Sequence, residues 1–491
     1  MSELICQGPF DNAKMNKPIK TGAGSSAAVA VDRNSTVPIF QQVYEGLRAQ
    51  IVSGAFGNSG HLPPTRALAV ELGVSRSTIV TAYDQLVAEG YAEGRQGSGF
   101  AVCQMGEVEF AAVAKKEDRK VVKQQSTGPK PFSPGVPDMR HFPHRQWARC
   151  VARVARNEPE ALVAGGDAFG DMRLRKAVCE HILQWRGVRA EPEQVLVTAG
   201  SGDALEICIR ALARPGERIG LEDPGYPQIR NFVTSLGMQP LWLRVGADGA
   251  ELPPADGGRS PGLVVLTPSQ QYPLGGAMTQ GRRLEYLNWA ERAGGWIIED
   301  DYDSEFRYAG RPIPALSGFD KNSRTIYAGS FSKIFSNNLR IGYLVIPQAL
   351  LPDFTDTLHR YGGKASIMPQ RALAVFFEEG EFYRHLRRVR RIYSERRKVL
   401  IEQLKSELGA SVSIEDHQAG MQFVVSLPGP CDDIALSQAA STGGLSVAAL
   451  SSFYAGSSAR KGLVLGFCAF TPEELEAGVR VLAPLIRGAL S

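Results

Sequence analysis

The chain has 491 residues, which is too long for one ordinary hydrophobic core, so we expect two or more domains. Its composition, 43% hydrophobic and 22% charged, is typical of a globular protein. The sequence contains no run of eighteen apolar residues, so we expect no membrane-spanning helix. The net charge of +4 does not by itself argue for nucleic acid, and seven scattered cysteines without metal-like spacing indicate free thiols in a reducing cytoplasm.

The first hundred residues contain a tail and then a run of helical patterns. Residues 1–35 keep little hydrophobic periodicity and show no signal-peptide pattern, so we expect a flexible tail. Apolar residues at three- and four-residue spacing then predict three helices, which start at about Ile39, within the segment Leu62–Arg66 and at Arg76. Thr65 and Ser75 are candidate caps, and Gly73 breaks the chain between the second and third helices.

This order of elements indicates a helix-turn-helix, and two short strands at 91–93 and 99–102 complete a wing. The segment 62–102, LPPTRALAVELGVSRSTIVTAYDQLVAEGYAEGRQGSGFAV, resembles the winged helix of GntR-type bacterial regulators. The resemblance implies a DNA-binding domain over residues 36–103.

The resemblance also implies which residues face double-stranded DNA. They begin the second helix near the phosphate backbone, begin the third helix in the major groove, and occupy the wing near the minor groove: Thr65, Arg66, Ser75, Arg76, Thr78, Arg95, Gly97 and Ser98. Against this, residues 36–103 hold four arginines, no lysine and five acidic residues. A basic footprint is absent, so a three-helix unit that binds no DNA is the alternative.

Residues 104–131 alternate basic and acidic side chains, keep no apolar period and end in a Gln, Ser, Gly and Pro-rich stretch. This composition is typical of a flexible tether. A second domain is expected over residues 132–491, where short apolar strands alternate with helical stretches. The expected strands are 195–198, 218–221, 263–267, 296–300 and 325–327. They predict a mostly parallel sheet covered on both faces, with ligands at the carboxyl ends of the strands.

Residues at those strand ends suit an aldehyde cofactor that carries a phosphate. The amine of Lys333 can form an imine with the aldehyde, while Ser330, Ser332 and Arg340 can bind the phosphate. The small-residue turn that opens a helix at Ser201 also favours an anion. Asp300 can hold a pyridinium N–H and Tyr302 can donate to a ring oxygen; a solvated acidic turn and a surface lysine are the plain alternatives.

In this order the residues resemble fold-type I pyridoxal-phosphate (PLP) enzymes of the aminotransferase class, an α/β fold. The resemblance covers about 360 residues and includes Asp223–Pro227 and Thr267–Pro273. It implies that Lys333 forms the imine and that the other cofactor contacts are Asp300, Tyr302, Tyr226, Ser201, Gly202, Ser330, Ser332 and Arg340. We expect burial and a neighbouring arginine to lower the pKa of Lys333.

A GntR-type winged helix joined by a linker to such a domain resembles the MocR/GabR regulators, as do the stretches IIEDDYDSEFRY and YAGSFSK. Four positions depart from relatives. Tyr272 stands where many transaminases carry asparagine, and Gly165 stands where many relatives carry a phosphate-binding tyrosine. Gln228 and Ser452 replace the two arginines of the GABA-responsive member, so we predict that GABA is not the effector.

The sequence therefore predicts a cytoplasmic PLP-dependent DNA-binding regulator that senses a small amine, an amino acid or PLP through a lysine–PLP aldimine. By resemblance it is a homodimer on paired half-sites that controls a catabolic or PLP-related operon. Two alternatives stay open: a working aminotransferase with a regulatory head, and a dimerisation scaffold that holds no PLP. The arginine-rich segment 384–397 is either a solvated or dimer-contact face or a nucleic-acid face.

Overall fold

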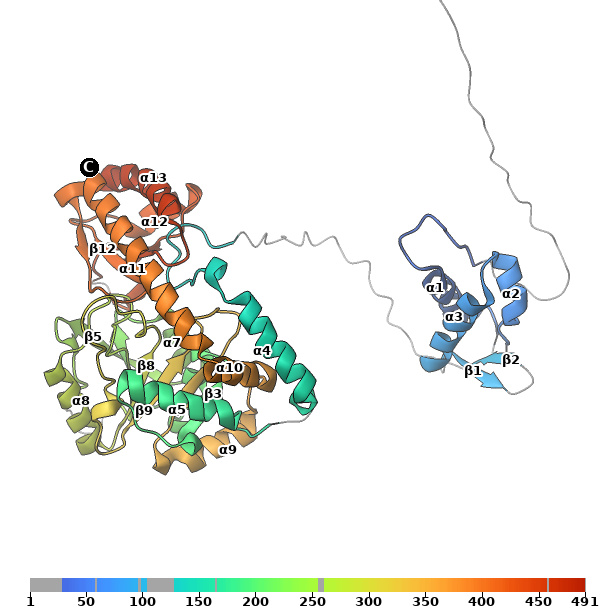
Figure 1. The fold of residues 1–491 in the computed structure, drawn as a ribbon, viewed down its shortest axis with the longest axis horizontal. Helices are drawn as coiled ribbons and strands as arrows, with labels where there is room; N and C mark the ends of the chain where they lie inside the picture. Colours follow the sequence, from blue (N-terminus) through green and yellow to red (C-terminus); the bar gives the residue numbers. More distant parts are fainter. Residues whose placement is uncertain are drawn as a thin grey trace, which may run out of the picture. The chain divides into compact units, whose positions relative to one another are not determined.

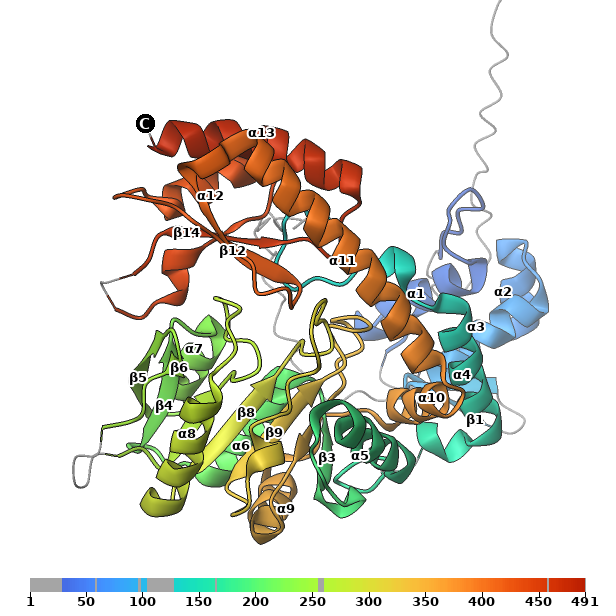
Figure 2. The ribbon, with the colours of Figure 1, turned by 60° about the vertical axis from the view of Figure 1, so that its left-hand side comes forward.

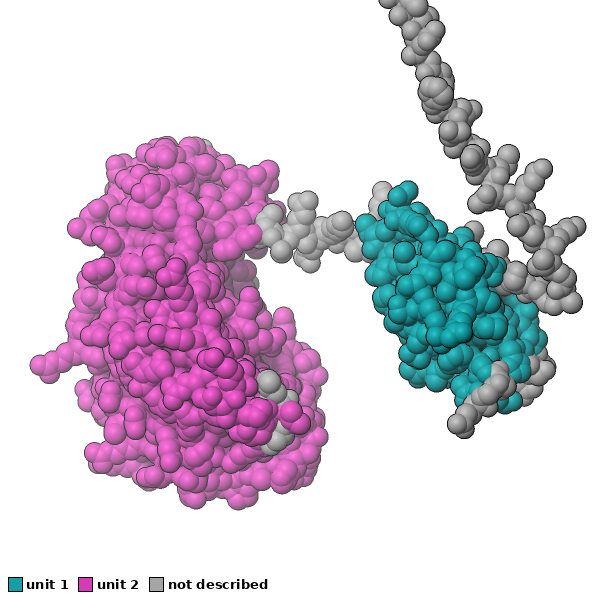
Figure 3. Space-filling model, turned by 45° about the vertical axis from the view of Figure 1, so that its right-hand side comes forward, with its two compact units in different colours: residues 1–124 teal, residues 125–491 magenta. Residues whose placement is uncertain are grey.

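The computed structural model describes residues 29–57, 60–95, 99–103, 128–163, 166–254, 260–456 and 459–490. The chain divides into two compact units, residues 1–124 and 125–491 (Figure 3). Their boundary falls inside the stretch that the sequence indicates as a tether. Within the described ranges, no helix combines the length and the apolar character needed to cross a bilayer.

In its described residues the smaller unit consists of three helices and a two-stranded ribbon (Figure 1). The elements are α1 (Ile39–Val52), α2 (Thr65–Leu72), α3 (Arg76–Ala88), β1 (Ala92–Arg95) and β2 (Gly99–Val102). The strands pair antiparallel, with Ala92 opposite Val102. The predicted winged helix-turn-helix is therefore present.

The periodic apolar residues that predicted these helices form the core of the smaller unit. Val43, Leu47, Ile79 and Tyr83 are all buried in one cluster with Leu68. Because the three helices contribute to the same cluster, the angle between α2 and α3 is set by packing as well as by the turn that joins them.

The turn and the caps follow the sequence with one exception. Gly73 adopts a left-handed φ of 63°, which a glycine allows without strain. The Ser75 hydroxyl accepts a hydrogen bond from the Thr78 backbone N–H at 3.2 Å and caps α3. The expectation that Thr65 caps α2 is wrong, because Pro64 occupies the cap position and Thr65 is the first helical residue.

Residues 29–35, which the sequence assigns to the tail, pack on the smaller unit. Val29 is buried in the core cluster and lies against Gly46, where an added Cβ would come within 2.9 Å of its side chain. The Arg33 guanidinium donates to the Gly73 carbonyl at 2.7 Å. The compact unit thus extends upstream of residue 36.

The larger unit is built on an eight-stranded sheet in the order β3-β10-β9-β8-β7-β4-β5-β6. The strands are β3 (Val195–Thr198), β4 (Arg218–Asp223), β5 (Gln239–Gly246), β6 (Gly249–Ala250), β7 (Leu263–Leu266), β8 (Trp296–Asp301), β9 (Thr325–Ser330) and β10 (Gly342–Val345). The five strands from β9 to β5 in this order are parallel, while β10 runs antiparallel to both β3 and β9. The mostly parallel sheet is confirmed, and β5, β6 and β10 are additions to the prediction.

Helices cover both faces of this sheet, as alternation of its buried residues requires. Leu263 and Val265 of β7 pack in one cluster with α6, α7 and α9, whereas Val264 and Leu266 pack with α8 on the other face. The helices of this unit up to the small sheet are α4 (His144–Asn157), α5 (Met172–Arg186), α6 (Ser201–Leu212), α7 (Pro227–Ser235), α8 (Gln280–Ala293), α9 (Leu351–Tyr361) and α10 (Ile367–Glu378).

A second, four-stranded antiparallel sheet has the order β11-β12-β14-β13. Its elements and their helices are α11 (Glu381–Leu408), β11 (Ser413–Glu415), β12 (Gln422–Ser426), α12 (Asp433–Thr442), β13 (Ala448–Ala449), β14 (Gly462–Gly466) and α13 (Pro472–Leu490). The 28-residue helix α11 runs from α10 to this small sheet (Figure 2). One core cluster accordingly joins Tyr327 of the large sheet to Phe423 of the small one.

Candidate functional site

A pocket in the larger unit opens where the strands of the large sheet end and the small sheet begins. Its lining gathers segments that are far apart in the sequence: Pro134, Gly135, Ser201, Tyr226, Thr267, Tyr272, Asp300, Tyr302, Asp303, Lys333, Met421 and Gln422. Five of the residues predicted from the sequence to contact PLP are therefore together, namely Ser201, Tyr226, Asp300, Tyr302 and Lys333.

Lys333 follows β9 and is held by a glycine from the start of the unit. Its Nζ donates to the Gly135 carbonyl at 2.8 Å, and a Cβ added to Gly135 would come within 2.9 Å of Nζ. Gly135 also has a left-handed φ of 64°, so both its conformation and this close approach favour glycine.

Burial lowers the pKa of Lys333, and the carboxyl groups of Asp303 and Asp300 oppose that change. The direction agrees with the sequence expectation, but the expected contribution of a neighbouring arginine is absent from the charges that act on this amine in the described residues. Desolvation alone thus favours the neutral, nucleophilic form.

Asp300 lies at the carboxyl end of β8, the strand that pairs directly with β9. Burial raises its pKa to about 7, and Asp301 and Glu222 add to the rise, while Lys333 lowers it. A carboxyl group in this state is poised to ionise when a cationic N–H is brought beside it.

Three tyrosine rings form a chain along the pocket. The Tyr272 ring stands edge-on to Tyr226 and Tyr302, with centroids 5.6 and 5.5 Å away, and also meets Phe453 at 5.5 Å. The aromatic residue at 272, which departs from the asparagine of many transaminases, is therefore packed between the two tyrosines expected to contact the cofactor ring.

The remaining predicted phosphate contacts lie beside the N-terminus of α6 rather than in the pocket lining. Gly200 caps that helix with a φ of 95°, and a Cβ added there would lie 4.0 Å from the Ser332 hydroxyl and 3.8 Å from Arg340 Cα. The Ser332 backbone N–H donates to the Ser330 hydroxyl at 3.2 Å. A Cβ on Gly202 would meet open space, so this helix start is accessible to an anion.

The donor set fits PLP. The buried amine of the pocket matches the aldehyde of PLP, and its carboxyl group matches the pyridine nitrogen. The tyrosine side chains match the cofactor ring, and the helix start beside two serines matches the phosphate. Buried Asp303 Oδ1 and Gln422 Nε2 have no hydrogen-bond partner among the described residues. Buried polar atoms without partners are costly, so the lining is suited to a polar ligand.

The sequence reasoning assigned no role to five lining residues: Pro134, Gly135, Asp303, Met421 and Gln422. Outside the lining, Arg230 donates to the Ser452 carbonyl at 2.9 Å. Arg230 lies on α7, and Tyr226 is the extended residue that precedes this helix, so no helical spacing links the two. Gly135 and Gln422 come from distant segments and carry no local signal.

In the smaller unit the described DNA-contact candidates lie at helix starts or in the ribbon. Arg66, Ser75 and Arg76 are exposed, and Thr65 and Thr78 are half-buried. Arg95 forms a surface ion pair with Glu93, and Gly97 and Ser98 lie outside the described residues. An ion pair at such exposure contributes little to stability, so Arg95 is free to exchange partners.

Comparison with known proteins identifies both units. Residues 140–482 match the family model for aminotransferase class I and II, and residues 39–102 match bacterial regulatory proteins of the gntR family. The probable rhizopine catabolism regulatory protein MocR of Rhizobium meliloti is 38% identical, over 92% of this chain and 95% of that protein.

The HTH-type pyridoxine biosynthesis transcriptional regulator PdxR of Corynebacterium glutamicum is 33% identical, over 89% of this chain and 94% of that protein. Among solved structures, the α-aminoadipate aminotransferase LysN from Thermus thermophilus superposes with a TM-score of 0.66. It is 27% identical and covers 74% of this chain and 93% of that one. The aminotransferase fold thus spans the larger unit, and the similarity to regulators spans both units.

Proposed function

The chain belongs to the MocR-type family of transcriptional regulators, and on that basis we propose that it senses a small amine, an amino acid or PLP through Lys333. It is a DNA-binding regulator whose aminotransferase-like domain takes PLP as its cofactor. The observation that carries the proposal is the pocket that brings Lys333, Asp300 and Tyr226 together.

When bound, PLP supplies an aldehyde that condenses with amines. Lys333 provides a largely desolvated amine, oriented by the Gly135 carbonyl. Asp300 would hold the ring nitrogen, Tyr302 would meet the ring oxygen and Tyr226 would cover the ring. The start of α6, with Ser201, Gly202, Ser330, Ser332 and Arg340, would hold the phosphate through backbone N–H groups, hydroxyls and one guanidinium.

Two positions that carry arginine in the GABA-responsive relative bear on whether this protein binds GABA. Gln228 is exposed on α7, and the Ser452 hydroxyl donates to the Ala449 carbonyl at 2.7 Å. Neither position supplies a guanidinium, and Arg230 is already engaged with the Ser452 carbonyl. We therefore predict that GABA is not the effector; calorimetric titration of the PLP-loaded protein should give no binding at micromolar GABA, and micromolar affinity refutes this prediction.

A homodimer on paired half-sites is part of the proposal, because two winged helices presented by one symmetric dimer match a repeated operator. Such a protein acts in the cytoplasm, where the operator lies. Analytical ultracentrifugation of the full chain with and without a two-half-site duplex tests the stoichiometry. A monomer that binds one half-site with full affinity contradicts this arrangement.

The decisive test of the cofactor site is the visible spectrum of the PLP-loaded protein. We expect a band that borohydride reduces in wild type and in Lys176→Ala, a variant of an exposed lysine on α5, and no such band in Lys333→Ala. The Lys333→Ala protein should bind operator DNA with its basal affinity but lose its response to ligand. A reducible band in Lys333→Ala, or loss of all DNA binding, contradicts the proposal.

The same preparation tests the alternative of a working aminotransferase, which the fold of the larger unit favours. Sustained conversion of an amino donor to a keto product by wild type, abolished in Lys333→Ala, establishes catalysis. A spectral change with amines that stops after one equivalent supports sensing, because exchange at the cofactor needs less positioning than the later proton transfers.

A further inference from the structure

The larger unit has a second pocket, between α11 and the segment that follows β8. Its cavity measures about 490 Å³, and five cationic side chains with one carboxylate surround it. The lining residues, which we call the α11 arginine pocket, are Arg307, Tyr308, Arg387, Arg390, Arg391, Ser394, Glu395 and Lys398. None of them lines the pocket of Lys333.

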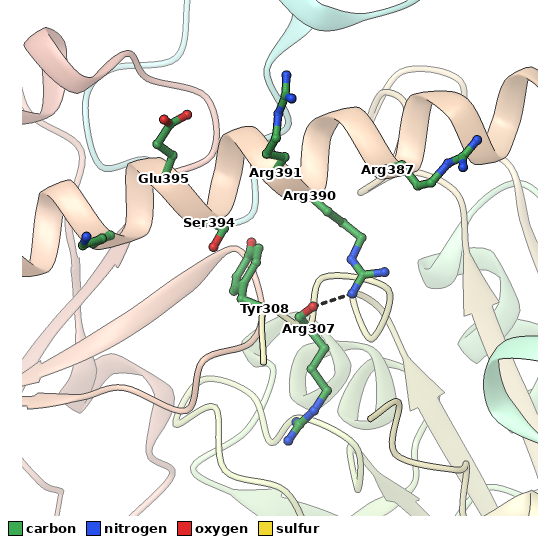
Figure 4. Close-up of a pocket in the computed structure, with 8 residues that line it drawn as sticks. Arg307, Tyr308, Arg387, Arg390, Arg391, Ser394 and Glu395 are labelled. Carbon is green, nitrogen blue, oxygen red and sulfur yellow. Dashed lines mark hydrogen bonds between the residues drawn. The ribbon is translucent and has the colours of Figure 1, made fainter. Parts of the chain in front are cut away.

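Helical spacing explains how α11 builds this wall. Arg387, Arg391, Ser394 and Lys398 succeed one another at intervals of three or four residues, which places them along one stripe of the helix. Figure 4 shows Arg390 reaching across to Arg307, with Arg387 and Arg391 projecting from the same helix.

Arg390 is fixed in place before any ligand binds. It donates to the Arg307 carbonyl at 2.6 Å, and its guanidinium carbon lies 5.4 Å from the centre of the Trp185 ring. Both contacts leave the carboxylate-binding edges of the guanidinium without an acidic partner in the described residues. An oriented cation of this kind costs less to order on binding an anion.

The guanidinium groups of this pocket form no ion pair in the described residues, unlike others on the same helix. Arg384 pairs with Glu381, and Arg397 pairs with Asp416. By contrast, Arg391 makes no hydrogen bond or ion pair with any described residue, and Arg387 contacts only the Tyr383 carbonyl of its own helix, at 3.3 Å.

The other two cations differ from each other. Lys398 forms a long ion pair with Glu402, at 3.8 Å, whereas the Nε of Arg307 is buried without a partner among the described residues. Glu395, the one carboxylate of the lining, forms no ion pair there either. A concave site that holds several unpaired guanidinium groups has the chemistry that recognises phosphate, since each fork can bind two oxygens.

We propose that the α11 arginine pocket binds a small molecule bearing two or more phosphate groups. Its volume of about 490 Å³ lies in the range of small-molecule sites. The Ser394 hydroxyl adds a neutral donor. The site is separate from the PLP phosphate contacts, and it does not depend on the proposed role of Lys333.

The test is calorimetric titration of the full-length, PLP-saturated protein with inorganic pyrophosphate. PLP saturation blocks the helix start at α6 as a competing site. The double variant Arg387→Gln, Arg391→Gln removes two guanidinium groups without an ion-pair partner and leaves shorter, neutral, polar side chains. We expect pyrophosphate binding to weaken at least roughly tenfold, because each substitution removes a charge-assisted hydrogen bond to a phosphate oxygen.

The matched control is Arg384→Gln, Lys405→Gln, which removes the same charge from the same helix outside the pocket. It should stay within about twofold of wild type, since long-range charge effects are screened by salt. Unchanged thermal midpoints and visible spectra show that both variants fold and hold PLP.

Three results overturn the proposal. The first is that wild type does not bind pyrophosphate saturably. The second is that the control variant weakens pyrophosphate binding as much as the pocket variant does. In the third, the pocket variant leaves pyrophosphate binding unchanged but weakens operator binding and lowers its salt dependence, which assigns the cations to DNA phosphates instead.

Discussion

In the smaller unit the described arginines expected to face DNA lie on the surface, whereas five of the residues expected to hold PLP line a pocket of the larger unit. Arg66 and Arg76 are exposed, while burial changes the pKa of Lys333 and Asp300. DNA recognition therefore depends on what a helix presents to water, and cofactor binding depends on what the sheet and the segments around it remove from water. We therefore expect substitutions in the smaller unit to change operator affinity and substitutions in the pocket of the larger unit to change PLP affinity.

The largest effect that separates the units is expected from Asp300→Asn. Removing one partner of a buried charge pair costs several kcal/mol, so PLP affinity should fall about 100-fold or more. Operator affinity measured without PLP should stay within about twofold. Equilibrium dialysis of PLP and fluorescence anisotropy with labelled operator report the two results, and equal losses in both break the comparison.

The same variant has a pH signature in the protein without PLP. Burial raises the pKa of Asp300 from 3.8 to about 7, so the folded chain keeps a proton that the unfolded chain releases. The free energy of unfolding therefore falls as pH rises from about 4 to 7 and is not lowered further above that range. Between pH 5 and 7 wild type should lose ~2 kcal/mol more than Asp300→Asn in urea denaturation. Parallel curves contradict the buried, protonated carboxyl.

A smaller effect, confined to the other unit, is expected from Arg76→Ala. Arg76 is exposed at the first position of α3, the helix expected in the major groove. Loss of a base or phosphate contact there should weaken operator binding by about 1–3 kcal/mol, roughly 5- to 150-fold. The PLP spectrum should not change. Arg48→Ala, on α1, is the control, and equal weakening by both variants points to a general charge effect.

The smallest effect is expected from Ser75→Ala, which removes the cap of α3. The Ser75 hydroxyl accepts the Thr78 N–H, and loss of such a cap costs ~1 kcal/mol. Thermal unfolding monitored in the smaller unit should shift to lower temperature, with the larger unit unchanged. Ser75→Asp restores an acceptor and should recover the stability; failure to recover it shows that capping is not the cause.

The elements of the smaller unit were predictable because local periodicity and turn residues determine them. Gly73 and Ser75 mark the turn and the third helix within one or two residues of where the structure has them. The packing of Val29 on Gly46 was not predictable, because the apolar run at residues 27–31 is too short to show a helical period.

The larger unit was predictable in its parallel strands and in the order of its PLP residues, but less so in its long-range pairing. Periodicity does not encode strand direction, so the antiparallel β10 between β3 and β9 was missed. Gly135 reaches Lys333 across 198 residues, and Gln422 comes from the small sheet. Such contacts are set by the tertiary arrangement, and no local sequence pattern predicts them.

The core that joins the two sheets of the larger unit has a consequence for how this unit unfolds. Tyr327, Tyr343, Phe423 and Leu465 belong to one buried cluster, which α11 crosses. Because neither sheet can lose this cluster without exposing the other, residues 128–490 should melt as one cooperative block. The smaller unit has a cluster of its own, so heat should open the chain in two steps, and PLP should shift only one of them.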